Sequence, residues 1–185
     1  SGDNGNNNNG GNNNGNQTEE TKIISGIAWL DENENGQKDS SEKLLDGITV
    51  RLLDISTNEF VKDENGNVVV ATTNETGFYS FTNVKKGQYL VVFEYDTSKY
   101  ILTVYKKDGV TEQNNSDVIS KTMEIDGQEK NIAVTEVIKL EDANVANINL
   151  GLMNAKTYDL QLDKYISKVT IQNNKTVSNN YTDAT

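Results

Sequence analysis

Short apolar runs with a period of two residues limit most strongly how this chain can fold. Ile48, Val50 and Leu52 point to one side of an extended strand, and the residues between them point to the other side. The same alternation recurs at 89–93 and 148–152. Valine, isoleucine, threonine and aromatic residues dominate these runs, and no segment has a convincing helical period. The pattern therefore predicts an all-β fold.

Clusters of Gly, Asn and Asp separate the apolar runs. Residues 63–67 (DENGN) lie between two such runs and predict a hairpin. Several short strands at this spacing are typical of an immunoglobulin-like β-sandwich. Residues 106–131 are polar and irregular. We expect a long excursion there, with one short strand near 118–123.

Three regions differ in composition. Residues 1–21 are rich in Asn and Gly and almost devoid of apolar side chains, which predicts a flexible linker. Residues 22–154 contain the predicted sandwich. Residues 155–185 read as the start of a second, truncated β domain or a tail, because about thirty residues cannot bury a core alone.

The absence of Cys and His and a formal net charge of −11 exclude several classes of function. Thiol nucleophiles, disulfides and the usual zinc ligand sets cannot occur. An acidic chain repels phosphate backbones and anionic membranes, and no apolar run could span a bilayer, so we expect neither nucleic-acid binding nor membrane insertion. The acidity either suits a hard cation such as calcium or only keeps the protein soluble.

Residues 31–42 (DENENGQKDSSE) match the template of a twelve-residue calcium-binding loop at every required position. Calcium prefers hard oxygen ligands, and such a loop supplies side chains, one backbone carbonyl and a closing glutamate. The candidate ligands are Asp31, Asn33, Asn35, Gln37, Asp39 and Glu42. The alternative is an acidic turn that binds nothing. Strand-like segments on both sides favour a structural site over a helical sensor.

Further motifs surround this loop in order: 25–31 (SGIAWLD), 45–54 (LDGITVRLLD), 73–81 (TNETGFYSF), 86–89 (KGQY), 115–117 (NSD) and 149–152 (NLGL). Together they resemble a B-type repeat of the serine-aspartate-repeat surface adhesins, a relative of the collagen-adhesin B-type domains, over residues 22–153. The resemblance implies a calcium-rigidified sandwich that spaces a ligand-binding head from the bacterial cell wall. It also implies Asp117 as a further calcium ligand.

The resemblance raises the question of an isopeptide bond, which related B-type domains form between Lys and Asn beside a buried acid. Trp29 occupies the position of that Lys, and we expect Glu94, near the position of the acid, to be an exposed strand end. We therefore predict no such bond within residues 22–153. In the tail, Lys164 shares a strand face with Leu160, Leu162 and Ile166. It is either one half of an isopeptide bond to an Asn beyond residue 185 or a bulge or snorkelling lysine.

The leading functional interpretation is a structural spacer of a secreted or cell-wall-anchored bacterial adhesin. Its expected partners are calcium, neighbouring domains of the same polypeptide and, through the parent protein, a host extracellular protein. A second interpretation is a ligand-binding module that uses the 106–131 excursion or Tyr95, Tyr100 and Tyr105, which could instead be packing residues. We predict no enzyme, because no carboxylate pair outside the loop has a second acid–base group beside it.

Overall fold

The computed structural model describes residues 20–156, 164–172 and 175–183, and their regular elements are all β-strands. The chain divides into two units, Ser1–Ala155 and Lys156–Thr185. Most of the predicted linker, residues 1–19, lies outside the described residues. No helix in the described ranges has the length and apolar character of a membrane span.

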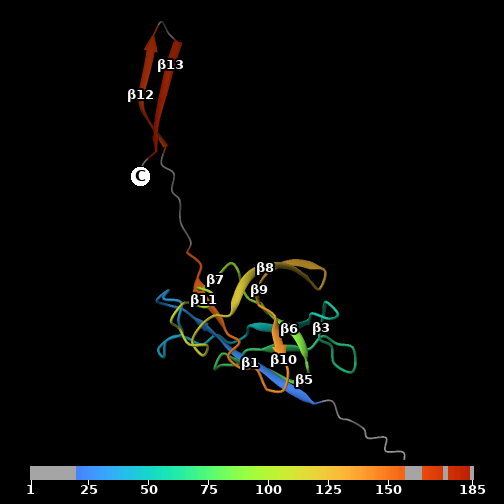
Figure 1. Cartoon of the computed structure of the whole chain (residues 1–185). Helices are drawn as coiled ribbons and strands as arrows, with labels where there is room; N and C mark the ends of the chain where they lie inside the picture. Colours follow the sequence, from blue (N-terminus) through green and yellow to red (C-terminus); the bar gives the residue numbers. More distant parts are fainter. Residues whose placement is uncertain (1–19, 157–163, 173–174, 184–185) are drawn as a thin grey trace, which may run out of the picture. The chain divides into compact units, whose positions relative to one another are not determined.

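Two sheets make up the first unit (Figure 1). The smaller sheet has the order β5–β1–β11–β7, and the larger one follows the path β3–β2–β6–β9–β8, with β4 added to β2 and β10 to β6. The strands are β1 (Thr21–Leu30), β2 (Thr49–Asp54), β3 (Glu59–Phe60), β4 (Val70–Thr72), β5 (Phe78–Lys85), β6 (Gly87–Glu94), β7 (Tyr100–Leu102), β8 (Val118–Ile125), β9 (Gln128–Thr135), β10 (Ile138–Leu140) and β11 (Leu150–Asn154). Strands β1 and β11 are parallel neighbours, with Trp29 opposite Gly151.

The main core lies between the sheets, where the alternate residues of the predicted strands meet. Its side chains that are at most 1% exposed include Val50, Leu52, Val91, Phe93, Leu150 and Leu152. Burying each such side chain contributes about 1.5–3 kcal/mol to folding. Tyr79 packs edge-on against Phe93 and donates a 2.7 Å hydrogen bond from its hydroxyl to the Ile148 carbonyl. The period-2 pattern and the prediction of an immunoglobulin-like β-sandwich are therefore confirmed.

The predicted hairpin around residues 63–67 is also confirmed. Lys62 and Val68 form a bridge across the turn, and the Asp63 carboxylate accepts hydrogen bonds from the backbone amides of Asn65 and Asn67. Gly66 has a φ of 84°, a conformation that glycine adopts without a steric cost. The strands that flank this hairpin, β3 and β4, both pair with β2.

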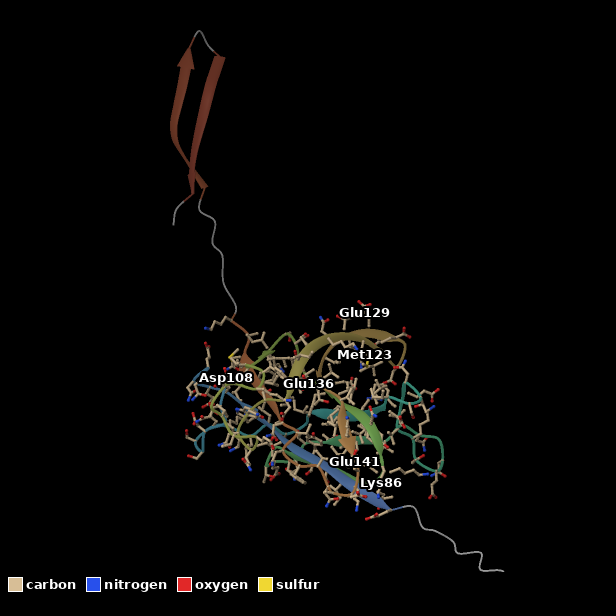
Figure 2. The ribbon with its side chains drawn as sticks, in the orientation of Figure 1. Lys86, Asp108, Met123, Glu129, Glu136 and Glu141 are labelled. Atoms are coloured by element: carbon tan, nitrogen blue, oxygen red, sulfur yellow. The ribbon has the colours of Figure 1, made fainter. Side chains whose placement is uncertain are left out.

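The prediction of one short strand in an irregular excursion over 106–131 is wrong in its second half. Strands β8 and β9 form a regular hairpin with a tight turn at Asp126 and Gly127, both at positive φ. Most β8 side chains face solvent, which explains the polar sequence. Ile125 and Ile132 instead pack with Val92 of the larger sheet in a second apolar cluster. Figure 2 shows Glu129 on the outside of this hairpin and Met123 on its inner side.

The second unit contains one antiparallel hairpin, β12 (Lys164–Gln172) and β13 (Lys175–Asp183). The sequence predicts an opening strand over 157–171, and the described part of this range, from Lys164 onward, is a strand; residues 157–163 lie outside the described residues. Leu160 and Leu162 lie outside the described residues, as does the side chain of Lys164. Both interpretations of Lys164 therefore stay predictions.

Candidate metal centre

The loop of residues 31–42 leaves the end of β1, and backbone hydrogen bonds hold its two ends together. The Leu30 amide donates to the Lys43 carbonyl at 2.8 Å, and Trp29 forms a bridge with Leu44. Inside the loop, Glu34 and Gly36 have φ values of 58° and 75°, so the backbone turns sharply twice. The chain is therefore curled with its ends fixed, as a cation-binding loop requires.

Asp31 anchors the start of the loop. Its side chain is buried, and its two oxygens accept hydrogen bonds from the backbone amides of Asn35, at 3.0 Å, and Gly36, at 2.8 Å. The Thr103 hydroxyl, from the segment after β7, also donates to this carboxylate. The first candidate ligand is thus fixed both by its own loop and by a residue 72 positions away.

Three side-chain amides converge on Asp39. Asn33 and Asn35 donate to Oδ2 of Asp39 and Gln37 donates to Oδ1, each at 2.8 Å. These hydrogen bonds, that of Asn33 foremost, lower the pKa of the Asp39 carboxyl below its usual value because they stabilise the charged form. The candidate ligands at loop positions 3, 5, 7 and 9 therefore face a common point.

Glu42 closes the other end of the loop. Its two oxygens accept hydrogen bonds from the backbone amides of Glu32, at 3.0 Å, and Asp39, at 2.9 Å. The structure therefore brings the predicted ligands of residues 31–42 into one compact loop, with Asp31 and Glu42 bound to its backbone.

The donor set fits a hard cation with mixed oxygen ligands. In the part of the chain that the structure describes, no three carboxylates gather closely enough to hold a metal ion by themselves. Amide and carbonyl oxygens would have to complete the shell, as they do in many calcium loops. Rotating the carboxamides of Asn33 and Asn35 by half a turn would direct their oxygens toward the point where their nitrogens now meet Asp39.

Asp117 lies outside this loop, in a second polar cluster at the start of β11. Burial raises the pKa of its carboxyl to about 6, although the Asn149 backbone amide donates to it at 2.8 Å and opposes the shift. Oδ1 of Asn115 is buried without a hydrogen-bond partner. Asn149 donates through its side chain to the carbonyls of Glu112 and Gln113. A half-buried carboxylate and, two residues earlier in the chain, a buried and unpartnered amide oxygen are groups that a cation would stabilise.

The two polar clusters share one covering segment, residues 103–117. The Lys38 amide donates to the Asn114 carbonyl at 2.8 Å, and the Lys107 ammonium group donates to the Asn35 carbonyl. Trp29 is fully buried, its ring lies close to Gly151, which Thr103 also approaches, and its indole nitrogen has no hydrogen-bond partner. Sequence reasoning missed Thr103 and Asn149, whose roles depend on contacts with distant residues.

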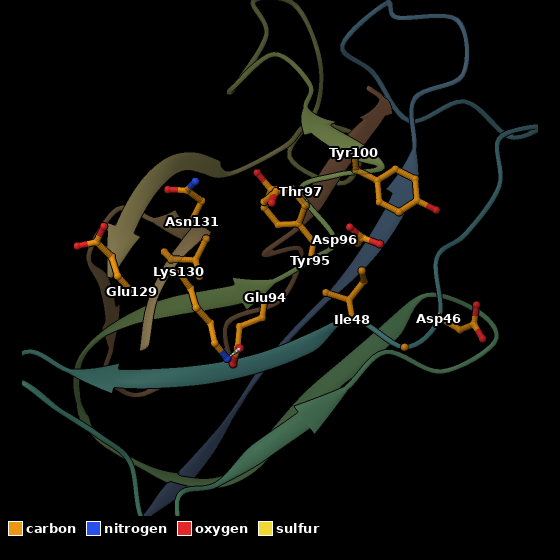
Figure 3. Close-up of a pocket in the computed structure, with 12 residues that line it drawn as sticks. Asp46, Ile48, Glu94, Tyr95, Asp96, Thr97, Tyr100, Glu129, Lys130 and Asn131 are labelled. Atoms are coloured by element: carbon orange, nitrogen blue, oxygen red, sulfur yellow. Dashed lines mark hydrogen bonds and ion pairs between the residues drawn. The ribbon is translucent and has the colours of Figure 1, made fainter. Parts of the chain in front are cut away.

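Glu94 is not the exposed strand end that the sequence predicted. Its side chain is only 17% exposed and pairs with Arg51 at 2.8 Å and Lys130 at 2.7 Å. These residues come from three strands that the larger sheet brings together. Beside them lies a groove of about 650 Å³, which Figure 3 shows with Lys130 reaching Glu94 and with Tyr95 and Tyr100 further along.

Fold and loop together define a class of protein: a β-sandwich module whose first two long strands are joined by an acidic, calcium-type loop. The family model of the SdrD B-like domain matches residues 22–145. The chain therefore belongs to the SdrD B-like domain family, which confirms the resemblance found in the sequence.

Individual relatives agree with this family. Serine-aspartate repeat-containing protein D of Staphylococcus aureus is 31% identical over 141 residues, which are 76% of this chain and 8% of that protein. Serine-aspartate repeat-containing protein I of Staphylococcus saprophyticus is 42% identical over 72 residues, 38% of this chain and 3% of that protein. The chain thus spans only a small part of the curated relatives it matches.

Among solved structures, the major pilin subunit BcpA of Bacillus cereus aligns with a TM-score of 0.36 at 19% identity, over 74% of this chain and 30% of that one.

Proposed function

We propose that this chain is a calcium-stabilised, non-catalytic spacer module of a secreted or cell-wall-anchored bacterial surface adhesin. The observation that supports it most is the convergence of the loop side chains on Asp39, with Asp31 and Glu42 fixing the loop backbone. The residues that would hold calcium are Asp31, Asn33, Asn35, Gln37, Asp39 and Glu42, and Asp117 would serve a further ion. Calcium would neutralise their charge and cross-link the loop.

The energetic argument is linkage. The loop of residues 31–42 carries five carboxylates, among them the candidate ligands Asp31, Asp39 and Glu42, and their mutual repulsion opposes folding. A cation that binds only the folded state adds its binding free energy to the stability. The loop is hydrogen-bonded to Thr103, Lys107 and Asn114 of residues 103–117, so the gain would extend to the rest of the sandwich.

The order of the strands supports the spacer role. The first and last strands of the sandwich, β1 and β11, are parallel neighbours. Tension applied through both ends of the unit therefore pulls them past one another and loads their hydrogen bonds together. A module that transmits force between neighbouring domains benefits from this arrangement.

A ligand-binding module is the second candidate, and the groove beside Glu94 would be its site. Tyr95 and Tyr100 line this groove but also pack against the main core. Glu94 and Lys130 are paired with each other. These contacts favour a structural role for the same residues, so the spacer remains the leading proposal.

The direct test is thermal unfolding with excess chelator and with saturating calcium. Calcium at a hundredfold excess over its Kd should raise Tm by roughly 10 °C for a domain of this size. Trp29 is the one tryptophan of the chain, is fully buried and stands two residues before Asp31, so its fluorescence should change in the same titration.

Two variants with the same change of charge complete the test. Glu42→Gln should weaken calcium binding by at least tenfold, because it removes the closing carboxylate. Glu32→Gln, at an exposed and non-ligating position of the same loop, should leave binding nearly unchanged. Equal Tm values with calcium and with chelator would refute the calcium proposal. Equal effects of the two variants on calcium binding would mean that the overall negative charge of the loop attracts the ion and that Glu42 is not a specific ligand.

A further inference from the structure

The loop contains an Asn–Gly pair, Asn35 and Gly36, with a chemistry of its own. The backbone nitrogen of the glycine can attack Cγ of the asparagine, because glycine has no side chain to hinder the approach. The new N–Cγ bond forms a succinimide ring, the Cγ–Nδ2 bond breaks, and ammonia leaves. Water then opens the ring. In sum, asparagine and water give aspartate or isoaspartate and ammonia, without an enzyme or oxidant.

The closed loop opposes the first step of this reaction at Gly36. Its backbone N–H donates to Oδ2 of Asp31 at 2.8 Å, and Gly36 is itself buried. Attack requires this nitrogen to lose its proton, and a carboxylate beside it disfavours the anion that results. A side-chain atom placed on Gly36 would lie 3.0 Å from Lys107 and 3.1 Å from Val104, so there is little room above the nitrogen.

The loop also restrains the carboxamide of Asn35 at both of its ends. Nδ2 donates to Oδ2 of Asp39 at 2.8 Å, and Oδ1 accepts from the Gln37 backbone amide at 2.8 Å. Closing the succinimide ring would reorient this group and break both hydrogen bonds. The reaction is therefore linked to local opening of the loop.

A second pair, Asn65 and Gly66, provides a reference inside the same molecule. Both residues are exposed, and among the described contacts the Asn65 carboxamide has no hydrogen bond. Gly66 donates to the Asp63 carbonyl at 3.0 Å, and nothing lies within 4 Å of the place where a side chain would stand. Gly36 and Gly66 have similar φ values, 75° and 84°, so the surroundings make the difference.

We propose that Asn35 is a deamidation site that the closed loop protects, and that opening of the loop converts this neutral position into a carboxylate. The aspartate product would add a fourth carboxylate to the three among the candidate ligands of the loop, and isoaspartate would also lengthen its backbone. Protection depends on the hydrogen bonds, the burial and the close contacts of Gly36 described above. Any effect of calcium on it rests on the proposed function.

The experiment is peptide mapping by mass spectrometry of the full chain after incubation in mildly alkaline buffer, in native conditions and in guanidinium. Each conversion adds one mass unit, and fragmentation separates Asn35 from Asn65. In native protein Asn65 should convert while Asn35 stays an amide. In guanidinium the two rates should become similar, so the ratio of Asn35 to Asn65 conversion should rise at least tenfold.

The same ratio in both conditions, or an Asn35 that does not convert even in guanidinium, would overturn the inference. Repeating the native incubation with calcium and with chelator separates it from the proposed function. Faster conversion of Asn35 alone in chelator would support both. Equal protection in calcium and chelator would support closure by hydrogen bonds alone and would count against the calcium site.

Discussion

At the residue scale, Asp117 has opposing influences on its ionisation. Burial raises the pKa of its carboxyl, whereas the hydrogen bond from the Asn149 amide lowers it, and burial prevails. Asp39 is the opposite case, since it is exposed to solvent on one side and receives three amide donors that favour its charged form. The two candidate positions should therefore respond differently to pH.

For Asp117 we expect stability that falls as the pH rises in the calcium-free protein. Its folded pKa of about 6 is above the ordinary 3.8, so the folded state retains a proton that the unfolded chain has released. The stability that the protonated Asp117 contributes to the folded state is fully present below about pH 4 and is lost as the pH rises through about 6. A nearby cation would favour the carboxylate and abolish the effect.

The measurement is Tm in chelator across this pH range for the wild type and Asp117→Asn. The variant cannot titrate at this position, so the difference in Tm between wild type and variant should decrease as the pH rises. The comparison cancels the other carboxyl groups. A difference that does not change with pH would show that Asp117 has an ordinary pKa.

At the scale of elements, the β8–β9 hairpin completes the larger sheet and covers part of its outer face. Ile125 and Ile132 bury against Leu53 and Val92 of the central strands. Arg51 donates to Asp126 in the hairpin turn at 2.9 Å. The hairpin is thus attached by an apolar cluster and by a charged contact, in addition to its pairing with β6.

Two isoleucines of β8 test this arrangement. Ile125 is 1% exposed and Ile119 is 49% exposed. Ile125→Ala should cost about 2–5 kcal/mol in the free energy of unfolding, because it leaves a cavity in the second cluster. Ile119→Ala should cost less than about 0.5 kcal/mol, since it lies at the surface. Chemical denaturation measures both, and equal costs would mean that the hairpin is not closed over the sheet.

At the scale of the whole sandwich unit, the direction of an applied force should decide its resistance. Pulling at the two ends loads the parallel β1–β11 pair in shear. Thr21 instead lies opposite Lys85 in the antiparallel pair β1–β5, so pulling between residue 20 and residue 86 opens that pair one hydrogen bond at a time.

Single-molecule pulling can compare the two geometries, and the absence of native cysteine makes cysteine handles unambiguous. We expect a markedly higher unfolding force for handles at residues 20 and 155 than for handles at residues 20 and 86. Calcium should raise the first force, because the loop follows β1 directly. Similar forces in both geometries would argue against the β1–β11 pair as the resisting element.

The sequence by itself determined most of the strands, the strand faces that form the main core and the candidate loop. Alternation at 48–53 indicates which residues face the main core because successive side chains of a strand point to opposite sides. The spacing within 31–42 is equally local, since all its ligands lie within one turn of chain. These features need no knowledge of distant residues.

Only the tertiary structure decided which distant groups meet. Thr103 reaches Asp31 across 72 positions, and Asn149 reaches Asp117 across 32. The sequence did not reveal the hairpin at 118–135, because most of its residues face water and its few buried residues contact other strands. Such contacts depend on how the sheets pack and on the course of residues 103–117, and neither leaves a periodic signal in the sequence.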